Sequence, residues 1–532
     1  MNTKHPRRAV AALAVAASGL LLVTACSSGD AAPAASSNPE VLVIDQSFTA
    51  QSIDPATIFQ VTDAIVATGI YQTLVSYQGD DPTPQPLLAS AYDVSEDGRS
   101  VTFTLDESAT FANGKPVTGD DVVFSLERLR NLKSSPSYLM DGLTVTAPDE
   151  HTVVVASENP ASYIPSLLTS TATSIVEADA VRAAGGSDAD DAAETDGAAA
   201  LFTSAENGVG SGPYQLESYD TNSQITLVSN PEWWGGDAAY ERIVIRNVKN
   251  PQQQKSNVES GESQIALDIP GRVAEGISTE ALDVNAYPSP EVLYLAMTMD
   301  ASSPTSDPAV RDAIRLGLDY DALVQLAGPG TLRAAGIIPS NLIGSIPADD
   351  AIQTDVEAAK QMIEDAGATG SKITFDYAND YTRLAGIDYN IIAQAVQTQL
   401  AAIGLTVELN PTPTSTSLQR YIDGETQLAL WSWPPDYGDP DNLLVFGPGA
   451  LIGERVQWTA DDAPDVVALG DTARTALGDD REPAYLAWNE ALVEQAPYAY
   501  LLEPTFTLVS SSAVGAKLDP MANLNLSQIA AN

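Results

Sequence analysis

Apolar residues along this chain follow two spacings, one typical of strands and one typical of helices. Short alternating or β-branched runs predict strands, and apolar positions three to four residues apart predict helices. Strands are predicted at 41–48, 101–105, 151–157, 212–220, 223–230, 242–248, 291–300, 372–378, 405–411 and 426–433. Helices are predicted at 62–77, 120–132, 309–318, 320–327, 355–368 and 386–404. This alternation predicts a mixed α/β chain.

Local signals mark several helix ends. Thr118 is a predicted N-cap, and Asp120 and Asp121 fall in the first turn, where acids suit the helix dipole. Gly404 is predicted to stop the long amphipathic helix that precedes it. Residues 183–212 are rich in Gly, Ala, Asp and Ser without clear periodicity, which predicts a loop or insertion.

The region before the first strand has the features of a secretory signal peptide. Lys4, Arg7 and Arg8 precede an apolar run that ends in small residues, and no acid occurs there. The string VTAC ends at Cys26, the single cysteine, and resembles the bacterial lipobox. That resemblance implies a signal peptide at 1–25 and a lipid anchor on Cys26, with 26–39 as anchor and flexible tether. An uncleaved anchor helix is the alternative.

The net charge of the chain limits which kinds of partner it can bind. The formal net charge is −46, and loss of the three basic residues with 1–25 would make it −49. Such a surface repels nucleic acid and anionic lipid headgroups, so no nucleic-acid partner is expected. Solubility outside the cytoplasm explains the acidity, and attraction of cationic ligands is the alternative.

Histidine is nearly absent, which limits catalysis and metal binding. Apart from His5, the chain has only His151, at the start of a predicted strand. A Ser-His-Asp triad would depend on that residue alone, and Cys–His metal clusters are excluded. No phosphate-binding glycine motif occurs, and 188–200 lacks the order of a calcium loop. No cofactor and no metal are expected, although catalysis by carboxylates alone stays open.

Five stretches, taken together and in order, resemble one family. They are 101–129 (VTFTLDESATFANGKPVTGDDVVFSLERL), 210–236, 292–324, 355–367 and 431–444 (WSWPPDYGDPDNLL). Their order and spacing are similar to those of the extracellular solute-binding proteins, family 5, of peptide-type ABC importers.

The resemblance implies a two-lobed α/β fold of the periplasmic-binding-protein kind (type II, large peptide-binding class) with an extra small domain. Lobe I would comprise 40–78, 206–296 and 503–532, the small domain 79–205, and lobe II 297–502. Ligand would bind between the lobes, which would close over it.

The same resemblance implies ligand-binding residues in WSWPPDYGDPDNLL. In peptide-binding members an acid in this pattern pairs with the ligand's α-ammonium, and the matching residue is Asp436. Trp433 and Tyr437 would stand beside it. A carboxylate in a partly dry cleft attracts a cation strongly, and a Trp face also favours cations. The alternative is that Asp436 and Asp439 only shape a turn.

Four further residues are candidates for the cleft. Arg383 follows a strand where dipeptide-binding members hold the ligand carboxylate with an arginine, although the alignment is offset by one residue. A surface salt bridge is its alternative role. Tyr381, Phe59 and Gln60 are also candidates, with core packing as the alternative for Phe59. Asn113 stands where many relatives have a histidine.

The expected function is binding of di- or oligopeptides and their delivery to an ABC permease and its ATPase subunits. The protein would be a non-enzymatic monomer on the outer face of the cytoplasmic membrane. A non-peptide ligand is the alternative: an oligosaccharide, an opine or another cationic metabolite, or a nickel chelate, which the scarcity of histidine disfavours. A carboxylate hydrolase using Asp436 and Asp439, and an adhesin or sensor, are further alternatives.

Overall fold

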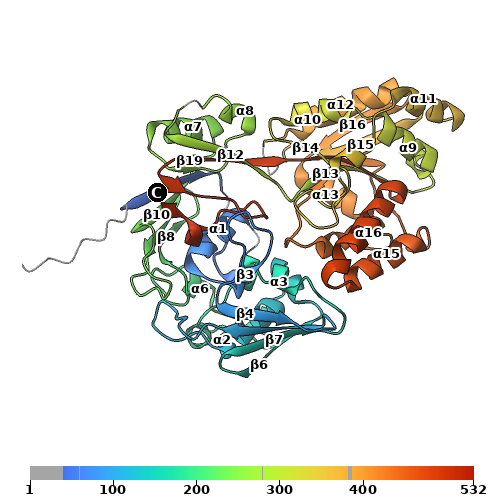
Figure 1. Cartoon of the computed structure of the whole chain (residues 1–532). Coiled ribbons are helices and arrows are strands. Elements are labelled where there is room, and N and C mark those ends of the chain that lie inside the picture. Colours follow the sequence, from blue (N-terminus) through green and yellow to red (C-terminus); the bar gives the residue numbers. More distant parts are fainter. Residues whose placement is uncertain (1–39, 49, 59, 278, 382–385) are drawn as a thin grey trace, which may run out of the picture. The chain divides into compact units, whose positions relative to one another are not determined.

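Three β-sheets organise the part of the chain that the computed structural model describes, residues 40–48, 50–58, 60–277, 279–381 and 386–532. Helices pack on each sheet (Figure 1), so the predicted mixed α/β class is confirmed. We call the units built on the seven-, six- and four-stranded sheets lobe I, lobe II and the small domain.

Lobe I is built on a sheet in which three neighbouring strands run parallel. The central strand β1 pairs in parallel with β10 on one side and with β11 on the other. The outer strands are antiparallel to their neighbours. The order is β12 (Leu282–Pro288), β19 (Thr505–Ser511), β11 (Ile265–Ala266), β1 (Val41–Gln46), β10 (Arg242–Asn247), β9 (Gln224–Ser229) and β8 (Tyr214–Asp220).

Lobe II contains a second group of parallel strands. β15 runs parallel to β16 and β17, whereas β13 is antiparallel to both of its neighbours. The order is β14 (Leu332–Arg333), β18 (Tyr498–Glu503), β13 (Val292–Met297), β17 (Leu428–Trp433), β15 (Lys372–Ala378) and β16 (Thr406–Thr412).

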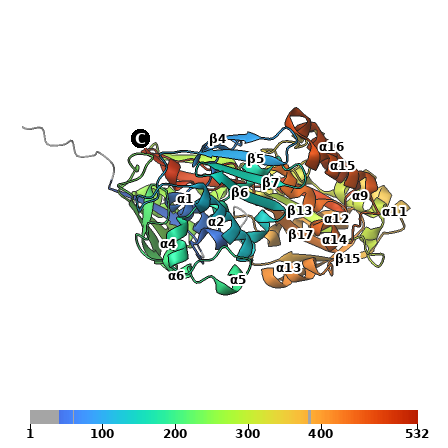
Figure 2. The same cartoon turned by 90° about the horizontal axis from the view of Figure 1, so that it is seen from below.

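The small domain has an antiparallel sheet with helix α2 (Gly119–Asn131) packed on it (Figure 2). Its order is β4 (Ala89–Val94), β5 (Ser100–Leu105), β7 (Thr152–Ser157) and β6 (Leu143–Asp149). Thr118 and Asp121 form a capping box at the start of α2, which confirms the predicted N-cap. Two strand pairs stand outside the three sheets: β2 (Val75–Ser76) with β3 (Gln85–Pro86), and β20 (Val514–Gly515) with β21 (Ala530–Ala531).

The remaining helices follow the sheets. Lobe I carries α1 (Val61–Ile70), α7 (Pro251–Ser260) and α8 (Gly271–Ala274). In the sequence between β7 and β8 come α3 (Ile164–Leu167), α4 (Ala178–Ala183), α5 (Ala192–Thr195) and α6 (Ala199–Phe202). Lobe II carries α9 (Pro308–Gly317), α10 (Tyr320–Ala327), α11 (Val356–Asp365), α12 (Tyr389–Ala402), α13 (Thr414–Ile422), α14 (Leu451–Arg455), α15 (Pro464–Thr475) and α16 (Arg481–Gln495).

The chain crosses between the lobes in two short segments that lie side by side. β12 ends at Pro288 in the sheet of lobe I, and β13 begins at Val292 in the sheet of lobe II. The return crossing runs from β18 to β19. The Ser289 N–H donates to the Pro504 carbonyl oxygen at 2.9 Å, which joins the two crossings.

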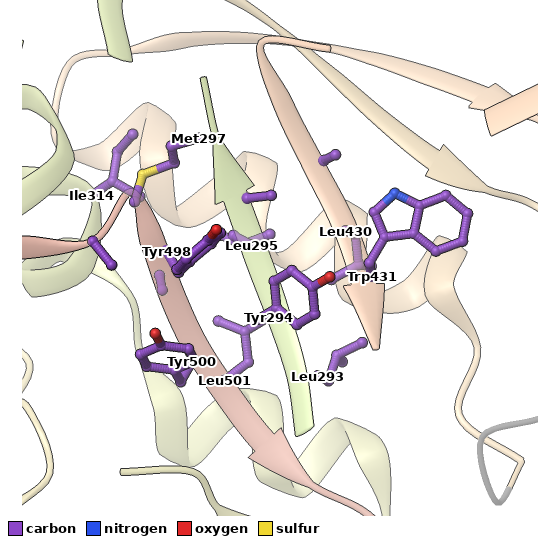
Figure 3. Packing of buried hydrophobic residues seen from close by; sticks show 14 of the residues in the cluster. Leu293, Tyr294, Leu295, Met297, Ile314, Leu430, Trp431, Tyr498, Tyr500 and Leu501 are labelled. Carbon is purple, nitrogen blue, oxygen red and sulfur yellow. The ribbon is translucent and has the colours of Figure 1, made fainter. Parts of the chain in front are cut away.

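β13 is the buried centre of lobe II (Figure 3). All six of its side chains are buried, as its unbroken apolar sequence predicts for a strand covered on both faces. The Tyr294 ring meets those of Phe446 and Tyr498 edge-on at 5.2 and 5.9 Å. Aromatic pairs prefer this geometry. Its hydroxyl lies 3.3 Å from that of Tyr421.

Two predicted segments differ in the structure. The helix predicted at 62–77 ends at Ile70, because Gln72 bridges to Ile175 and Val75–Ser76 pairs with β3. The predicted loop at 183–212 contains two short helices, and its Asp196 is buried against Arg128. Pairing with distant segments explains both differences, since local sequence does not report such partners.

Among the described residues, no helix is both long enough and apolar enough to span a membrane. In the same part of the chain, no group of three or more His, Cys, Asp or Glu side chains could hold a metal ion.

Candidate ligand-binding site

A cavity of about 1060 Å³ lies where the two lobes and the small domain meet. We call it the interlobe cavity. Lobe I contributes Gln46, Tyr71 and Asp268 to its wall, the small domain contributes Tyr138, and lobe II contributes Tyr381 and Asp436. Its volume is slightly above the range of about 300–1,000 Å³ that is usual for small-molecule sites.

Carboxyl ends of parallel strands from both lobes open into this cavity. In lobe I, Gln46 ends β1, Lys249 follows β10 and Asp268 follows β11. In lobe II, 379–381 follow β15 and 434–437 follow β17. Ligands of open α/β sheets bind outside the carboxyl ends of strands, because loops and free backbone groups gather there. Each lobe therefore presents a binding edge to the same space.

The loop after β17 carries Asp436 into the cavity. Asp436 is partly buried, and its N–H donates to Asn442 Oδ1 at 3.2 Å. The Tyr138 phenol of the small domain hydrogen-bonds the Asp436 carboxyl group. Burial, together with the negative charge of Asp436, raises the pKa of Tyr138. A carboxylate of lobe II thus faces a phenol from another part of the molecule.

Asp439, three residues further on, has a structural role. It is 3% exposed, accepts the Asp441 N–H at 3.0 Å as the N-cap of a short 3₁₀ helix, and pairs with Arg481 at 2.8 Å. It is not among the described residues that line the cavity. Because Arg481 holds this carboxylate, Asp436 and Asp439 do not form a pair of acids facing one ligand.

Tyr437 connects the loop to the small domain. Its ring stacks on Tyr163 with centroids 5.7 Å apart, and the residue is 7% exposed. The ring belongs to the apolar core of the small domain, although Tyr437 also lines the cavity. Burial, reinforced by the charges of Asp441 and Asp439, raises the pKa of Tyr437 well above its usual value. Its phenol therefore stays neutral at physiological pH.

Gly438 brings the backbone of this loop close to Tyr77 and Met521. A Cβ atom at Gly438 would overlap the Tyr77 hydroxyl and lie 3.2 Å from the Met521 sulfur. Both Tyr77 and Met521 line the cavity. The absence of a side chain at 438 thus lets the two lobes touch beside the site.

Comparison with known proteins identifies the family. Residues 83–447 match the family model of the bacterial extracellular solute-binding proteins, family 5 Middle. The chain belongs to this family.

Relatives of this family 5 protein match over nearly the whole chain. The probable D,D-dipeptide-binding periplasmic protein of Escherichia coli (strain K12) is 27% identical over 497 residues, covering 91% of this chain and 92% of the relative. The di/tripeptide-binding protein 2 of Pseudomonas aeruginosa (strain UCBPP-PA14) is 25% identical over 537 residues, covering 94% and 96%.

Solved structures show the same fold. The ABC transporter-associated periplasmic binding protein DppA of Helicobacter pylori, in complex with the peptide STSA, superposes with a TM-score of 0.73 at 21% identity, covering 93% of this chain and 98% of that one. A dipeptide-binding protein from Pseudoalteromonas sp. SM9913, in complex with Met-Leu, gives 0.74 at 21% identity, covering 93% and 100%. The predicted two-lobed binding-protein fold with a small extra domain is confirmed.

The predicted site residues of this family 5 protein fall in three groups. Asp436, Tyr437, Tyr381 and Gln60 line the interlobe cavity. The ring of Trp433 packs edge-on against Phe446 at 5.7 Å, and 434–437 form the wall at that point instead. Phe59, Arg383 and Cys26 lie outside the described residues.

Several residues of the cavity wall carry a weak signal in the sequence or none. Asp268 lies two residues after the end of β11, a position where a strand delivers a polar side chain to a site. Asp519 accepts the N–H groups of Met521 and Asn523 at 2.9 and 2.8 Å, and burial raises its pKa to about 7. Tyr138 has no comparable signal, because a 3₁₀ turn of the small domain brings it to the cavity.

Proposed function

We propose that this family 5 protein binds peptides in the interlobe cavity and delivers them to an ABC importer. The observation that carries the proposal is the cavity itself, where strand ends of both lobes meet around Asp436. The names of its relatives support a peptide ligand, since these relatives are called dipeptide- or di/tripeptide-binding proteins. Two related structures also hold peptides. The role is binding and delivery without turnover.

Asp436 would hold the α-ammonium group of the peptide. The carboxylate lies at the cavity with the Tyr138 phenol beside it. An arriving ammonium gains a charge-assisted hydrogen bond in a partly dry space, where Coulomb attraction is stronger than in water. Tyr138 and Tyr437 would supply the apolar sides of this subsite, and a cationic group also favours a nearby aromatic face.

Ligand would stabilise the closed arrangement of the lobes. The two crossing segments, joined at Ser289 and Pro504, are the natural hinge. Because the ligand contacts both lobes at once, it binds the closed state more tightly and shifts the population towards it. The closed lobes would form the surface that docks on the permease, and partner ATPase subunits would supply the energy.

Lipid on Cys26 would hold the protein on the outer face of the cytoplasmic membrane, and 27–39 would act as a tether. Fractionation of cells that express the full chain tests this. The protein should appear in the membrane fraction, and Cys26→Ser should move it to the soluble fraction. A membrane-bound Cys26→Ser variant would contradict lipid anchoring through this residue.

Native mass spectrometry of the protein from residue 27 onward tests the ligand class. Acid release should yield di- to oligopeptides. An opine, a sugar or a metal chelate in their place would keep the family role and overturn the peptide assignment.

Calorimetry with a released peptide then tests Asp436. Asp436→Asn should weaken binding by about 2–5 kcal/mol, as loss of one partner of a buried charge pair does. The control is Asp461→Asn, which removes an exposed acid of lobe II and should leave the affinity unchanged. Equal affinities of wild type and Asp436→Asn would remove Asp436 from the site.

A further inference from the structure

The described wall of the interlobe cavity carries far more negative than positive charge. Six acids line it: Asp268, Glu291, Asp380, Asp388, Asp436 and Asp519. Lys249 is the single lysine among the described lining residues, and no arginine occurs among them. Two of the acids have structural roles. Asp380 accepts the N–H and hydroxyl of Thr414 at the start of α13, and Asp388 caps α12.

Asp268 is less exposed than Asp380 and Asp388, and one of its oxygens, like one of theirs, is bound within the fold. Its Oδ2 accepts the Ser47 N–H at 2.5 Å and the Gln254 side-chain amide at 3.1 Å. Its Oδ1 accepts no hydrogen bond from the described residues, and no cation lies within 4.0 Å of the carboxylate there. Lys249 is exposed at the cavity and forms no ion pair with it. Burial raises the pKa of Asp268.

Other buried aspartates in the two lobes form ion pairs with arginine, whereas Asp268 forms none with the described residues. Asp45, on β1 of the same sheet, pairs with Arg246 at 2.7 Å. In lobe II, Asp376 pairs with Arg420 at 3.0 Å. A buried carboxylate without a counter-charge is unfavourable, so folds commonly give it a cation or a full set of donors. Asp268 has one free acceptor atom and faces a space that a ligand can enter.

Gln46 gives an independent indication at the same edge of the sheet. It is 5% exposed and lines the cavity, and its Oε1 finds no hydrogen-bond donor among the described residues. It immediately precedes Ser47, whose N–H binds Asp268, so the two side chains belong to adjacent strand ends. Buried amide oxygens nearly always accept a hydrogen bond, and a ligand donor would satisfy this one.

From these observations we infer that Gln46 and Asp268 form a subsite in lobe I for a cationic side chain, that is, for a lysine or arginine residue of the bound peptide. The inference rests on the proposed function. An ammonium or guanidinium group offers several donors and a positive charge, which match an anionic and a neutral acceptor side by side. With Asp436 on the opposite lobe, a basic peptide would join the lobes through a cation at each end.

Calorimetry with matched tripeptides tests the subsite. Each of three alanine tripeptides carries lysine at a different position, and its partner carries norleucine, the uncharged analogue, at that position. At least one lysine peptide should bind wild type about tenfold or more tightly than its partner, as a desolvated charge pair allows. Asp268→Asn, whose amide oxygen can still accept the Ser47 N–H, should reduce that preference to below about threefold and leave the norleucine peptide unchanged.

Two further variants separate the subsite from other causes. Gln46→Met should also lower the lysine preference. This variant tests the subsite on its own if Asp268→Asn fails to fold. Asp380→Asn removes another acid of the same cavity and should retain the preference. If Asp380→Asn abolishes the lysine preference as fully as Asp268→Asn does, the combined negative charge of the cavity causes the preference and the subsite is wrong. Equal binding of lysine and norleucine peptides by wild type also overturns the subsite, whereas binding of no peptide overturns the proposed function.

Discussion

At the level of single residues, Arg128 connects segments that lie far apart in the sequence. This α2 side chain is 2% exposed and binds both oxygens of Asp54 at 2.6 and 2.7 Å. Its Nε also binds Asp196 at 2.7 Å. One guanidinium thus joins the small domain, the start of lobe I and the segment before β8. Arginine suits this position because its planar fork can serve two carboxylates at once.

Arg128→Met should lower the free energy of unfolding by about 3–5 kcal/mol, because it leaves two buried carboxylates without a counter-charge. Urea denaturation followed by circular dichroism measures this change. The matched control is Arg99→Met in the same domain, where the side chain is exposed and the expected change is within about 0.5 kcal/mol. Similar unfolding midpoints for the two variants would contradict the role given to Arg128.

Asp519 makes stability depend on pH in the opposite sense to a salt-bridged acid. Burial raises its pKa from an ordinary 3.8 to about 7. Between about pH 4 and 7 the folded state keeps a proton that the unfolded state has lost, so the free energy of unfolding falls as pH rises. One group contributes at most about 1.4 kcal/mol per pH unit to this slope.

Asp519→Asn should remove this contribution, since its amide oxygen can accept the same two N–H groups and cannot titrate. Unfolding free energies of wild type and variant, measured from pH 4 to 8, should diverge progressively as pH rises to about 7. The variant should be the more stable at pH 8. A constant difference across the range would show that Asp519 titrates normally in the folded protein.

The sequence alone supports only part of this residue-level description. The family pattern predicts a binding role for Asp436, the acid after the Trp-containing strand, and this residue lies at the cavity. The composition of 183–212 predicts a loop, and nothing near Asp196 in the sequence indicates its partner Arg128, 68 positions away. The ion pairs of buried acids depend on contacts between distant segments, which spacing along the chain does not encode.

Among the elements, the loop after β17 is where the lobes and the small domain meet. Tyr437 packs on Tyr163 of the small domain, and Gly438 passes against Tyr77 of lobe I. In the proposed opening of the lobes, this loop would have to separate from at least one of these two neighbours. Its contacts on two sides predict that its geometry controls closure.

Gly438→Ala should weaken ligand binding by about tenfold or more, because a methyl group at this position overlaps the Tyr77 hydroxyl in the arrangement seen here. Unfolding of the ligand-free protein should change little, since opening of the lobes removes the overlap. Adding Tyr77→Phe, which deletes the hydroxyl, should restore most of the affinity. Calorimetry on the two single variants and the double variant measures this, and an additive loss in the double variant would contradict the steric explanation.

Element boundaries followed the sequence where local chemistry determines them. The capping residues of α2 and the buried strand β13 match their predictions, because a polar cap and an unbroken apolar run are local signals. The apolar spacing predicts a longer helix than α1, since 71–77 have helical spacing as well. The backbone of 71–77 pairs instead with residues from other segments. Whether this segment forms a helix or such pairs depends on the rest of the fold.

At the scale of the whole molecule, the family pattern gave the fold class, and the sheets show which distant segments combine. The sheet of lobe I takes strands from 41–46, from 214–288 and from 505–511. Such an assembly follows from no periodicity in the chain. The division into domains at the predicted boundaries stays a prediction, and β13, which starts at Val292, already belongs to the sheet of lobe II.

The position of β19 has a consequence for the biosynthesis of the chain. This strand comes from the last part of the sequence, yet it lies between β12 and β11 inside the sheet of lobe I. Until residues 505–511 have left the ribosome, β12 lacks its partner strand β19 and the sheet is incomplete. Lobe I of a nascent chain therefore stays incompletely folded until this late strand has left the ribosome, although strands β1 to β12 precede it in the sequence.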